Sequence, residues 1–123
     1  MSIRFVTKTI HAYLDYPVAL GLMAVPMVLG LGQSNPLAFW LSVCTGVAAL
    51  VLTILTDHVT GIVRIIPYQV HLMVDAAVGA VFLVAPFVLG FAGLDKAYYL
   101  INAAAVLTVV SLHKGEEGLP QPA

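Results

Sequence analysis

The sequence predicts an all-α membrane protein with four transmembrane helices, arranged as two tandem, parallel helical-hairpin repeats. Two observations predict this fold: the chain is strongly apolar, and its sequence repeats at a spacing of sixty residues. Hydrophobic residues make up 61% of the 123 residues and charged residues only 9%. A soluble domain of this size needs many more charges on its surface, so the expected solvent of this chain is lipid.

Four apolar segments each approach the length of roughly 20 residues that a helix needs to cross a bilayer. They run from about Tyr13 to Leu31, Leu37 to Thr56, Val70 to Ala92 and Ala97 to Leu112. A turn-forming stretch at residues 32–36 separates the first two segments, and residues 93–96 separate the last two. Because both connections are short, we expect each pair of segments to form an antiparallel hairpin.

The duplication is clearest over the first segment of each hairpin. Shifting the sequence by sixty positions aligns, without a gap, Arg4 with Arg64, His11 with His71, Asp15 with Asp75 and Pro26 with Pro86. The predicted organisation is a first repeat over residues 1–60 and a second over residues 61–114, each an interfacial segment followed by two transmembrane helices. Both repeats enter the membrane from the same side, so a pseudo-two-fold axis along the membrane normal should relate them. Residues 115–123 are expected to form a disordered tail.

A Pro-x-Val-Leu-Gly sequence recurs near the end of the first segment of each hairpin. Proline removes a backbone hydrogen bond and bends a helix, and glycine allows the chain to leave the helix. We therefore expect Pro26 and Gly30, and likewise Pro86 and Gly90, to kink and end these two helices.

The stretches that hold these residues, Gly21 to Gly30 and Val81 to Gly90, resemble the repeat of the SPW family. That family is named for a Ser-Pro-Trp tripeptide followed by an apolar residue and Leu-Gly. The tripeptide here is Val-Pro-Met at residues 25–27 and Ala-Pro-Phe at residues 85–87, so only the proline is shared. The resemblance implies a small bacterial or archaeal integral membrane protein, and it implies no particular activity.

Basic residues indicate how the chain lies in the membrane. Arg4 and Lys8 precede the first segment, Arg64 lies between the hairpins, and Lys114 follows the last segment. Only Lys96 falls on the opposite side. The positive-inside rule predicts that both termini and the middle link are cytoplasmic, which in a bacterium would be the inner face of the inner membrane.

A polar set, Arg-x6-His-x3-Asp, is also duplicated, and ionisable residues in a membrane segment are functional candidates. Positions four apart share a helix face, so His11 should meet Asp15 and His71 should meet Asp75. An aspartate that accepts a hydrogen bond from one imidazole nitrogen leaves the other nitrogen free for a ligand. Two facing histidines suit axial ligation of a haem, a pigment, or a metal site that the two aspartates complete.

The same residues allow a purely structural interpretation. An ion-pair network across the repeat axis would consist of Arg4, Arg64, Asp15 and Asp75. It would anchor helix ends without performing chemistry, and a position at the membrane edge lowers the cost of each charge. The remaining histidines, His58 and His113, fall on the same side of the membrane, so all four histidines could share one site.

Small and polar residues inside the segments predict how the helices pack. Gly46, Ala76 and Ala80 belong to small-xxx-small spacings that permit close contact, and Asn102 should hydrogen-bond to a neighbouring helix. The single cysteine, Cys44, is expected to be a small buried residue without a disulfide. Aromatic residues near the segment ends are expected to form interfacial belts; these are Trp40, Tyr98 and Tyr99 at one side and Tyr13, Tyr16 and Tyr68 at the other.

Three functions are compatible with these observations. The first is a non-catalytic structural or accessory subunit of a larger membrane complex or homo-oligomer, favoured by the small size and the absence of an extramembrane domain. The second is a haem-, pigment- or metal-binding protein with His11 and His71 as ligands, supported by Asp15 and Asp75. The third is a small transporter or channel. Hydrolase chemistry has no support because no nucleophile has a plausible base, and the net charge of -1 shows no bias toward nucleic acid.

Overall fold

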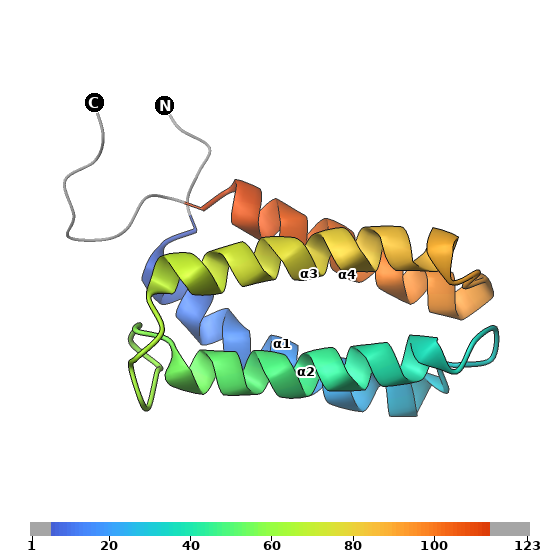
Figure 1. Ribbon diagram of the computed structural model, residues 1–123, viewed down its shortest axis with the longest axis horizontal. Helices are drawn as coiled ribbons and strands as arrows, with labels where there is room; N and C mark the ends of the chain where they lie inside the picture. The colour runs from blue at the N-terminus through green and yellow to red at the C-terminus, as the bar shows by residue number, and fades with distance from the viewer. Residues whose placement is uncertain (1–5, 114–123) are drawn as a thin grey trace.

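A computed structural model of the chain describes residues 6–113, which contain four α-helices and no β-strand. In chain order these are α1 (Lys8–Leu29), α2 (Leu37–Leu55), α3 (Tyr68–Val88) and α4 (Gly93–Ser111). Figure 1 shows these helices running side by side, with short turns between the members of each pair. The predicted fold of two helical hairpins is confirmed. The predicted tail, residues 115–123, lies outside the described residues.

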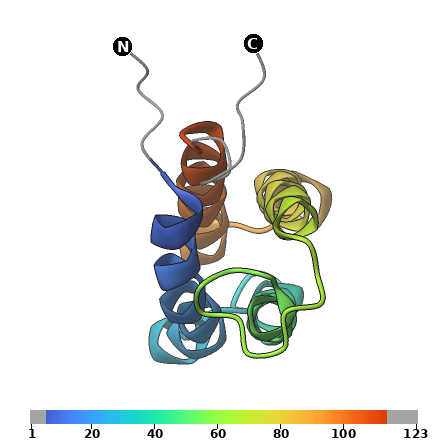
Figure 2. The same cartoon turned by 90° about the vertical axis from the view of Figure 1, so that its left-hand side faces the viewer.

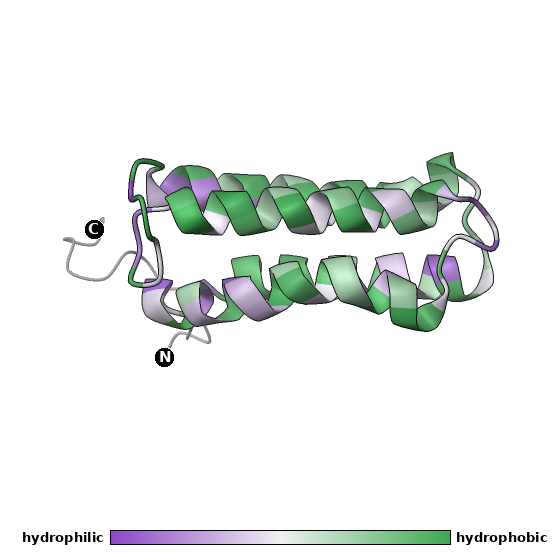
Figure 3. Cartoon of the chain, turned by 90° about the horizontal axis from the view of Figure 1, so that it is seen from below, coloured by the Kyte–Doolittle hydropathy of each residue, from purple (hydrophilic) through white to green (hydrophobic). Residues whose placement is uncertain are grey.

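Three of the helices, α1, α2 and α3, are long and apolar enough to cross a membrane. Helix α4 is of similar length, but it carries Asp95 and Lys96 near its start and Asn102 in its middle, and these residues lower its hydropathy. Figure 3 shows apolar residues over most of the length of the bundle and polar residues gathered toward its ends. This distribution suits a protein whose middle lies in lipid.

The first helix of each hairpin ends in the same local structure, as the duplicated sequence implies. Gly30 and Gly90 have φ angles of 64° and 69°, which glycine adopts without strain. The next amide in each copy donates to the carbonyl of Pro26 or Pro86, at 3.0 and 2.9 Å. These closures satisfy carbonyl groups that the helix end would leave without partners, and they turn the chain toward the second helix.

The helices pair within each repeat, so that α1 packs against α2 and α3 packs against α4. The end-on view of Figure 2 shows a four-cornered bundle in which α2 and α3 lie on one side and α1 and α4 on the other. Contacts between α2 and α3 are few. We call the end at which residues 56–67 join the two repeats the link end, and the end with the two hairpin turns the hairpin end.

Each hairpin has one glycine at a position where its two helices pack closely together. A Cβ atom at Gly46 of α2 would lie 2.8 Å from the carbonyl oxygen of Ala19 on α1. A Cβ atom at Gly79 of α3 would lie 2.6 Å from Val106 on α4. Neither position has room for a methyl group unless a neighbour shifts. The spacing of small residues predicts Gly46 at such a contact but does not predict Gly79.

Other small or polar residues of the helices lie in different surroundings. Ala76 is half-buried, and Ala80 is exposed beside an apolar groove between α2 and α3. The side-chain amide of Asn102 donates to the carbonyl of Tyr98 in its own helix, at 2.8 Å. Cys44 is exposed on α2, so the expectation that it is a buried packing residue is wrong.

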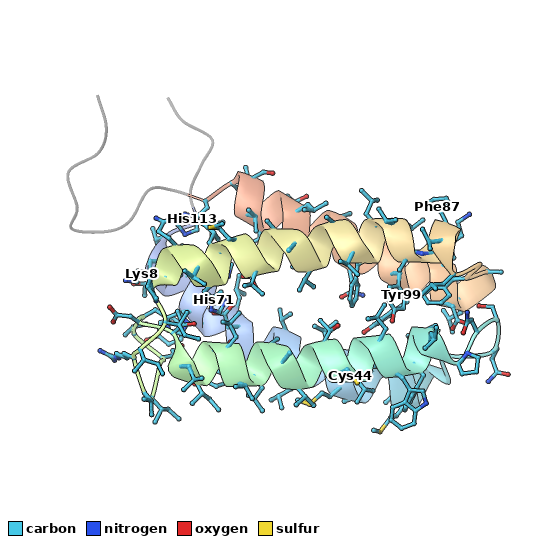
Figure 4. All side chains as sticks on the ribbon, viewed as in Figure 1. Lys8, Cys44, His71, Phe87, Tyr99 and His113 are labelled. Atoms are coloured by element: carbon cyan, nitrogen blue, oxygen red, sulfur yellow. The ribbon has the colours of Figure 1, made fainter. Side chains whose placement is uncertain are left out.

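The expected aromatic belts are only partly present. Trp40 is 57% exposed and Tyr13 is 62% exposed, as residues at a membrane interface should be. Tyr98 and Tyr99 are instead buried in the core of the hairpin end, and Tyr68 is buried at the link end. In Figure 4 the labelled Tyr99 side chain lies inside the bundle. These three tyrosines therefore do not belong to the belts.

Hydrogen bonds tie the two repeats together at the hairpin end. The carboxylate of Asp95 accepts from the amides of Gly32 and Ser34 at 2.8 and 3.0 Å, and from the Ser34 hydroxyl at 2.5 Å. The side chain of Asn35 donates to the carbonyl of Leu89 at 2.9 Å. The turn of the first hairpin is thus held against the second hairpin.

The link, residues 56–67, folds back over the end of α2. Amides of Ile62 and Val63 donate to the carbonyl of Ile54, and the amide of Ile66 donates to that of Leu55, at 2.8 to 3.0 Å. Residues 61–66, expected as an interfacial segment, form no helix. This fold-back brings the first residues of the link next to the start of α1 and α3.

Candidate metal centre

Two histidines and two aspartates meet inside the link end of the bundle. His11 and Asp15 lie four residues apart on α1, and His71 and Asp75 lie four residues apart on α3. One ligand-type atom from each of the four side chains lies within 4.8 Å of the other three. In Figure 4 the labelled His71 side chain points from α3 toward the space between the helices. We call these four residues the His–Asp cluster.

The contacts of the His–Asp cluster cross between the repeats in both directions. The Nε2 atom of His11 lies 2.6 Å from Oδ2 of Asp75 and 3.1 Å from Oδ1 of Asp15. The Nε2 atom of His71 lies 3.3 Å from Oδ2 of each aspartate. Because His11 contacts Asp75 and His71 contacts Asp15, the cluster lies where a two-fold axis relating the repeats would pass.

Thr56, at the end of α2, fixes the ring of His71. Its hydroxyl donates to the carbonyl of Leu52 at 2.5 Å and lies 2.7 Å from Nδ1 of His71. A hydroxyl group has one hydrogen, so the Thr56 oxygen accepts a hydrogen bond from Nδ1–H of His71. The other ring nitrogen of His71 is therefore the one available at the carboxylates.

A third histidine, from the link, contacts the His–Asp cluster from outside. The Nε2 atom of His58 lies 3.1 Å from Oδ2 of Asp15, and the His58 residue is 3% exposed. Burial lowers the pKa of His58, and this effect outweighs the nearby Asp15 carboxylate, which raises it. A neutral His58 donates one hydrogen bond to Asp15 and holds that carboxylate in position.

Aromatic rings surround the His–Asp cluster at the link end. The Tyr68 hydroxyl lies 2.6 Å from Nε2 of His113, and the Tyr68 ring is stacked on His71 with centroids 6.2 Å apart. The rings of His113 and His11 are 6.1 Å apart. All four histidines of the chain thus gather at one end, as their positions in the sequence allow.

His11 and His71 occupy matching positions of the two repeats but have different surroundings. The Nδ1 atom of His71 donates to Thr56. The Nδ1 atom of His11 is buried and has no hydrogen-bond partner within residues 6–113. Such an atom is uncommon in a folded protein and marks a place where a water molecule or a change of state is expected.

The arginines of the duplicated set lie apart from the aspartates as far as the structure describes them. The Arg64 guanidinium donates to two carbonyl groups of its own link, both at 3.2 Å. Arg4 lies outside the described residues. Within residues 6–113, the ion-pair partners of Asp15 and Asp75 are histidines.

A cavity of about 130 Å³ adjoins the His–Asp cluster and extends toward the middle of the bundle. All four helices contribute to its wall. Besides the four cluster residues, its polar lining consists of Thr53 on α2 and Asn102 on α4, and the rest of the lining is apolar. The cluster therefore faces a space between the helices rather than a tightly packed core, and this space is partly open to the surface beside the exposed Leu14 and Val18.

A protein-family model described as the SPW repeat domain matches residues 9–114 of this chain. The chain belongs to the SPW repeat family. The match extends over both hairpins of the SPW repeat protein, whereas the resemblance seen in its sequence covers the first segment of each. No match was found among curated proteins or among solved structures.

Sequence patterns of this SPW repeat protein identify part of the site. The His-x3-Asp spacing, seen twice, predicts the four residues that meet. Thr56 and His58 complete their surroundings but are not duplicated, since the positions sixty residues later hold Glu116 and Gly118. The one signal in the sequence is that both residues lie at or just after the end of a long apolar segment, on the same side of the membrane as the cluster.

Proposed function

We propose that this SPW repeat protein binds one divalent transition-metal ion between its two repeats, with His11, Asp15, His71 and Asp75 as ligands. The observation that carries this proposal is the convergence of four ligand-type atoms within 4.8 Å. Two imidazole nitrogens and two carboxylate oxygens form a donor set that suits ions such as Zn²⁺. One divalent cation balances the charge of the two carboxylates when both imidazoles are neutral.

The separations between the donor atoms support a four-coordinate site. With metal–ligand bonds of about 2.0–2.2 Å in a tetrahedron, neighbouring ligand atoms stand about 3.3–3.6 Å apart. The Nε2 atom of His71 lies 3.3 Å from Oδ2 of Asp15 and 3.3 Å from Oδ2 of Asp75, which is the separation expected between neighbouring ligand atoms. The contact of 2.6 Å between His11 and Asp75 would have to lengthen, which a small rotation of either side chain achieves.

The surroundings of the ligands also support metal binding. Histidine ligands almost always donate their second N–H to a partner, and carboxylate ligands are themselves hydrogen-bonded. Thr56 accepts from His71, and His58 lies within hydrogen-bond distance of Asp15. Both partners come from the short stretch at the end of α2, so one local segment orients one ligand from each repeat.

The dimensions of the site favour a metal ion over a haem or another large pigment. The ring centroids of His11 and His71 are 5.5 Å apart, and the carboxylates of both aspartates lie against the Nε2 atoms. The adjoining cavity measures about 130 Å³. A cavity of about 150 Å³ accommodates a molecule of the size of benzene, and a porphyrin is several times larger.

Metal binding is tested with protein purified in mild detergent, stripped with a chelator and titrated with Co²⁺ or Zn²⁺. We expect one equivalent to bind, with the intense visible absorption of tetrahedral Co²⁺, and a melting temperature that falls when the chelator is added. His71→Gln keeps an N–H group near the carboxylates but lacks the imidazole lone pair, and it should abolish binding. Asp57→Asn, at an exposed position of the link, is the matched control.

A purely structural His–Asp cluster gives a different result in the same experiment. The wild-type protein would then bind no more metal than His71→Gln, and chelator would leave the melting temperature of both unchanged. Asp15→Asn would still destabilise the protein, because it removes an acceptor of the buried hydrogen bonds. That outcome would contradict the proposed metal site.

A role as an accessory subunit or homo-oligomer is the second candidate, and one observation favours it. The space between α2 and α3 is an apolar groove of about 550 Å³ that includes Ala80 and Leu41 in its lining. A helix of a partner subunit or of a second copy would fill such a groove. Native mass spectrometry of the protein extracted from its own membrane tests this candidate. We expect the protein to carry a bound subunit or a second copy of itself, and a protein that carries only lipid would contradict the candidate.

A further inference from the structure

The cavity beside the His–Asp cluster is continued by a second, smaller one. The first cavity runs from the cluster to Asn102, near the middle of α4. The second measures about 20 Å³ and is bounded by Leu22, Phe82 and again Asn102. Val18 and Val106 also line both cavities. The two spaces therefore adjoin at the level of Asn102, between the helices.

Polar groups in the larger cavity make water its expected content. Empty cavities in proteins are apolar, whereas a cavity with several polar partners holds ordered water. Here carboxylates and imidazoles lie at one end and the Asn102 amide lies at the other. About 10–15 Å³ of such space holds one water molecule, so a volume of about 130 Å³ accommodates several. The smaller cavity has room for about one.

A hydrogen-bonded pair of side chains lies beyond the smaller cavity, toward the hairpin end. The hydroxyl of Ser42 donates to the carbonyl of Leu22 at 2.8 Å and lies 2.6 Å from the hydroxyl of Tyr98. Because the Ser42 hydrogen is directed at Leu22, the Tyr98 hydroxyl donates to Ser42. The side chains of Leu22 and Phe82, 7% and 2% exposed, line the smaller cavity together with Asn102.

We propose that the interior of the bundle is a conduction path for protons, hydrated from the His–Asp cluster to Asn102 and closed beyond Asn102 by Leu22 and Phe82. Hydrophobic constrictions of this kind close membrane pores by excluding water. The path goes beyond metal binding and does not require it. It gives a function to the polar groups inside the bundle, which membrane proteins rarely place there without one.

Protons are the expected cargo because of the size and chemistry of the path. A space that holds one water molecule excludes a hydrated metal ion. Hydroxyl groups and water molecules accept one hydrogen and donate another at the same oxygen atom, so they pass a proton along a chain, and the Asn102 amide can hold a water molecule of that chain by a hydrogen bond. Side chains of this kind recur from the cavity to the Ser42–Tyr98 pair.

Hydration is tested first, with a single cysteine placed in the cavity. Cys44→Ala removes the only natural cysteine, and Val106→Cys then places a thiol on the wall shared by the two cavities. Ag⁺ is added first, in aqueous buffer, and should reach and bind this thiol if the cavity is hydrated. The protein is then denatured, and the Ag⁺-bound thiol should resist alkylation. Ile101→Cys on the same helix is the control, since Ile101 is 68% exposed and faces lipid. Equal protection of the two thiols, or none at position 106, would overturn the hydrated path.

Conduction is tested in proteoliposomes that hold a pH-sensitive dye, a potassium gradient and valinomycin, with chelator present throughout. Proton entry should be slow in the wild type and several-fold faster in Phe82→Ala. Phe87→Ala removes the same atoms from a residue that is 65% exposed and should not raise the rate. Adding Asn102→Leu to Phe82→Ala should return the rate to that of the wild type.

Two results of the proteoliposome experiment would contradict the path. One is a rate in Phe82→Ala no higher than in Phe87→Ala, in protein whose circular dichroism and melting temperature show that it is folded. The other is a rate that Asn102→Leu leaves unchanged. Both rates are measured without metal, so they test the conduction path alone. They remain a valid test of the path even if the protein is found not to bind metal.

Discussion

At the scale of residues, Thr56 determines which nitrogen of His71 faces the aspartates. Its hydroxyl oxygen accepts a hydrogen bond from Nδ1–H of His71, so Nε2 is the nitrogen that faces the carboxylates. No spacing rule points to it. A threonine at the end of an apolar segment is common, and its partner is fifteen residues away in the next repeat. The pairing of His11 with Asp15 was predictable, in contrast, because residues four apart on a helix share a face. Local geometry is thus readable from the sequence, whereas contacts made by a folded-back link are not.

Thr56→Val should weaken metal binding while leaving the four ligands in place. Valine has nearly the shape of threonine but accepts no hydrogen bond, so Nδ1–H of His71 would lose its partner. Removal of such a partner lowers metal affinity by about 10- to 100-fold, which Co²⁺ titration measures. Thr53→Val is the control, since Thr53 is equally buried and also bonds a carbonyl of its own helix. Equal losses in the two variants would show that Thr56 does not position His71.

At the scale of elements, the four helices follow from the apolar segments, and their partners follow from the short turns. Which tyrosines enter the core was not predictable, because Tyr98 and Tyr99 lie at a segment end where either lipid or a neighbouring helix can cover them. The residues at the two close helix–helix contacts were likewise only partly predictable from the sequence. Position 19 pairs with position 46, and position 79 pairs with position 106, sixty residues on. The glycine is on the second helix in one copy and on the first helix in the other, so the duplication preserved the contact but not the residue.

Gly46→Ala should destabilise the first hairpin. The added methyl group would meet the backbone of α1 at Ala19, which cannot move away as a side chain can. Overpacking of this kind costs about 1–3 kcal/mol. Gly21→Ala, where a Cβ atom meets nothing within 4 Å, is the control and should be neutral or stabilising. Unfolding in mixed detergent micelles measures both, and equal stability of the two variants would contradict the close contact.

At the scale of the whole molecule, the two hairpins are joined at both ends and separated by cavities between. The His–Asp cluster joins them at the link end, and the hydrogen bonds of Asp95 join them at the hairpin end. The sequence predicts the first of these joints through its duplicated spacing. It does not predict the second, because Asp95 in a short polar connection has the appearance of an ordinary turn residue.

Asp95→Asn should loosen the hairpin end. The carboxylate accepts three hydrogen bonds from the other repeat, and an amide would turn its own N–H groups toward some of those donors. Loss of a hydrogen bond to a charged group costs about 1.5–3 kcal/mol, which unfolding in mixed micelles should detect. Gln33→Ala, which removes an exposed hydrogen bond in the same turn, should have a much smaller effect. Similar losses would mean that the Asp95 contacts do not hold the repeats together.

The position of the His–Asp cluster between two copies of one unit has a further consequence. Each repeat carries one histidine and one aspartate, so a free hairpin would build the cluster only by meeting a second hairpin. Because the link joins the two hairpins covalently, each hairpin is present at a high effective concentration near the other. Assembly of the cluster therefore does not depend on how much protein the membrane contains. The same link reaches only one of the two histidines. Two identical hairpins would surround both histidines alike, whereas in this chain the Nδ1 atom of His71 has a hydrogen-bond partner from the link and that of His11 has none within residues 6–113.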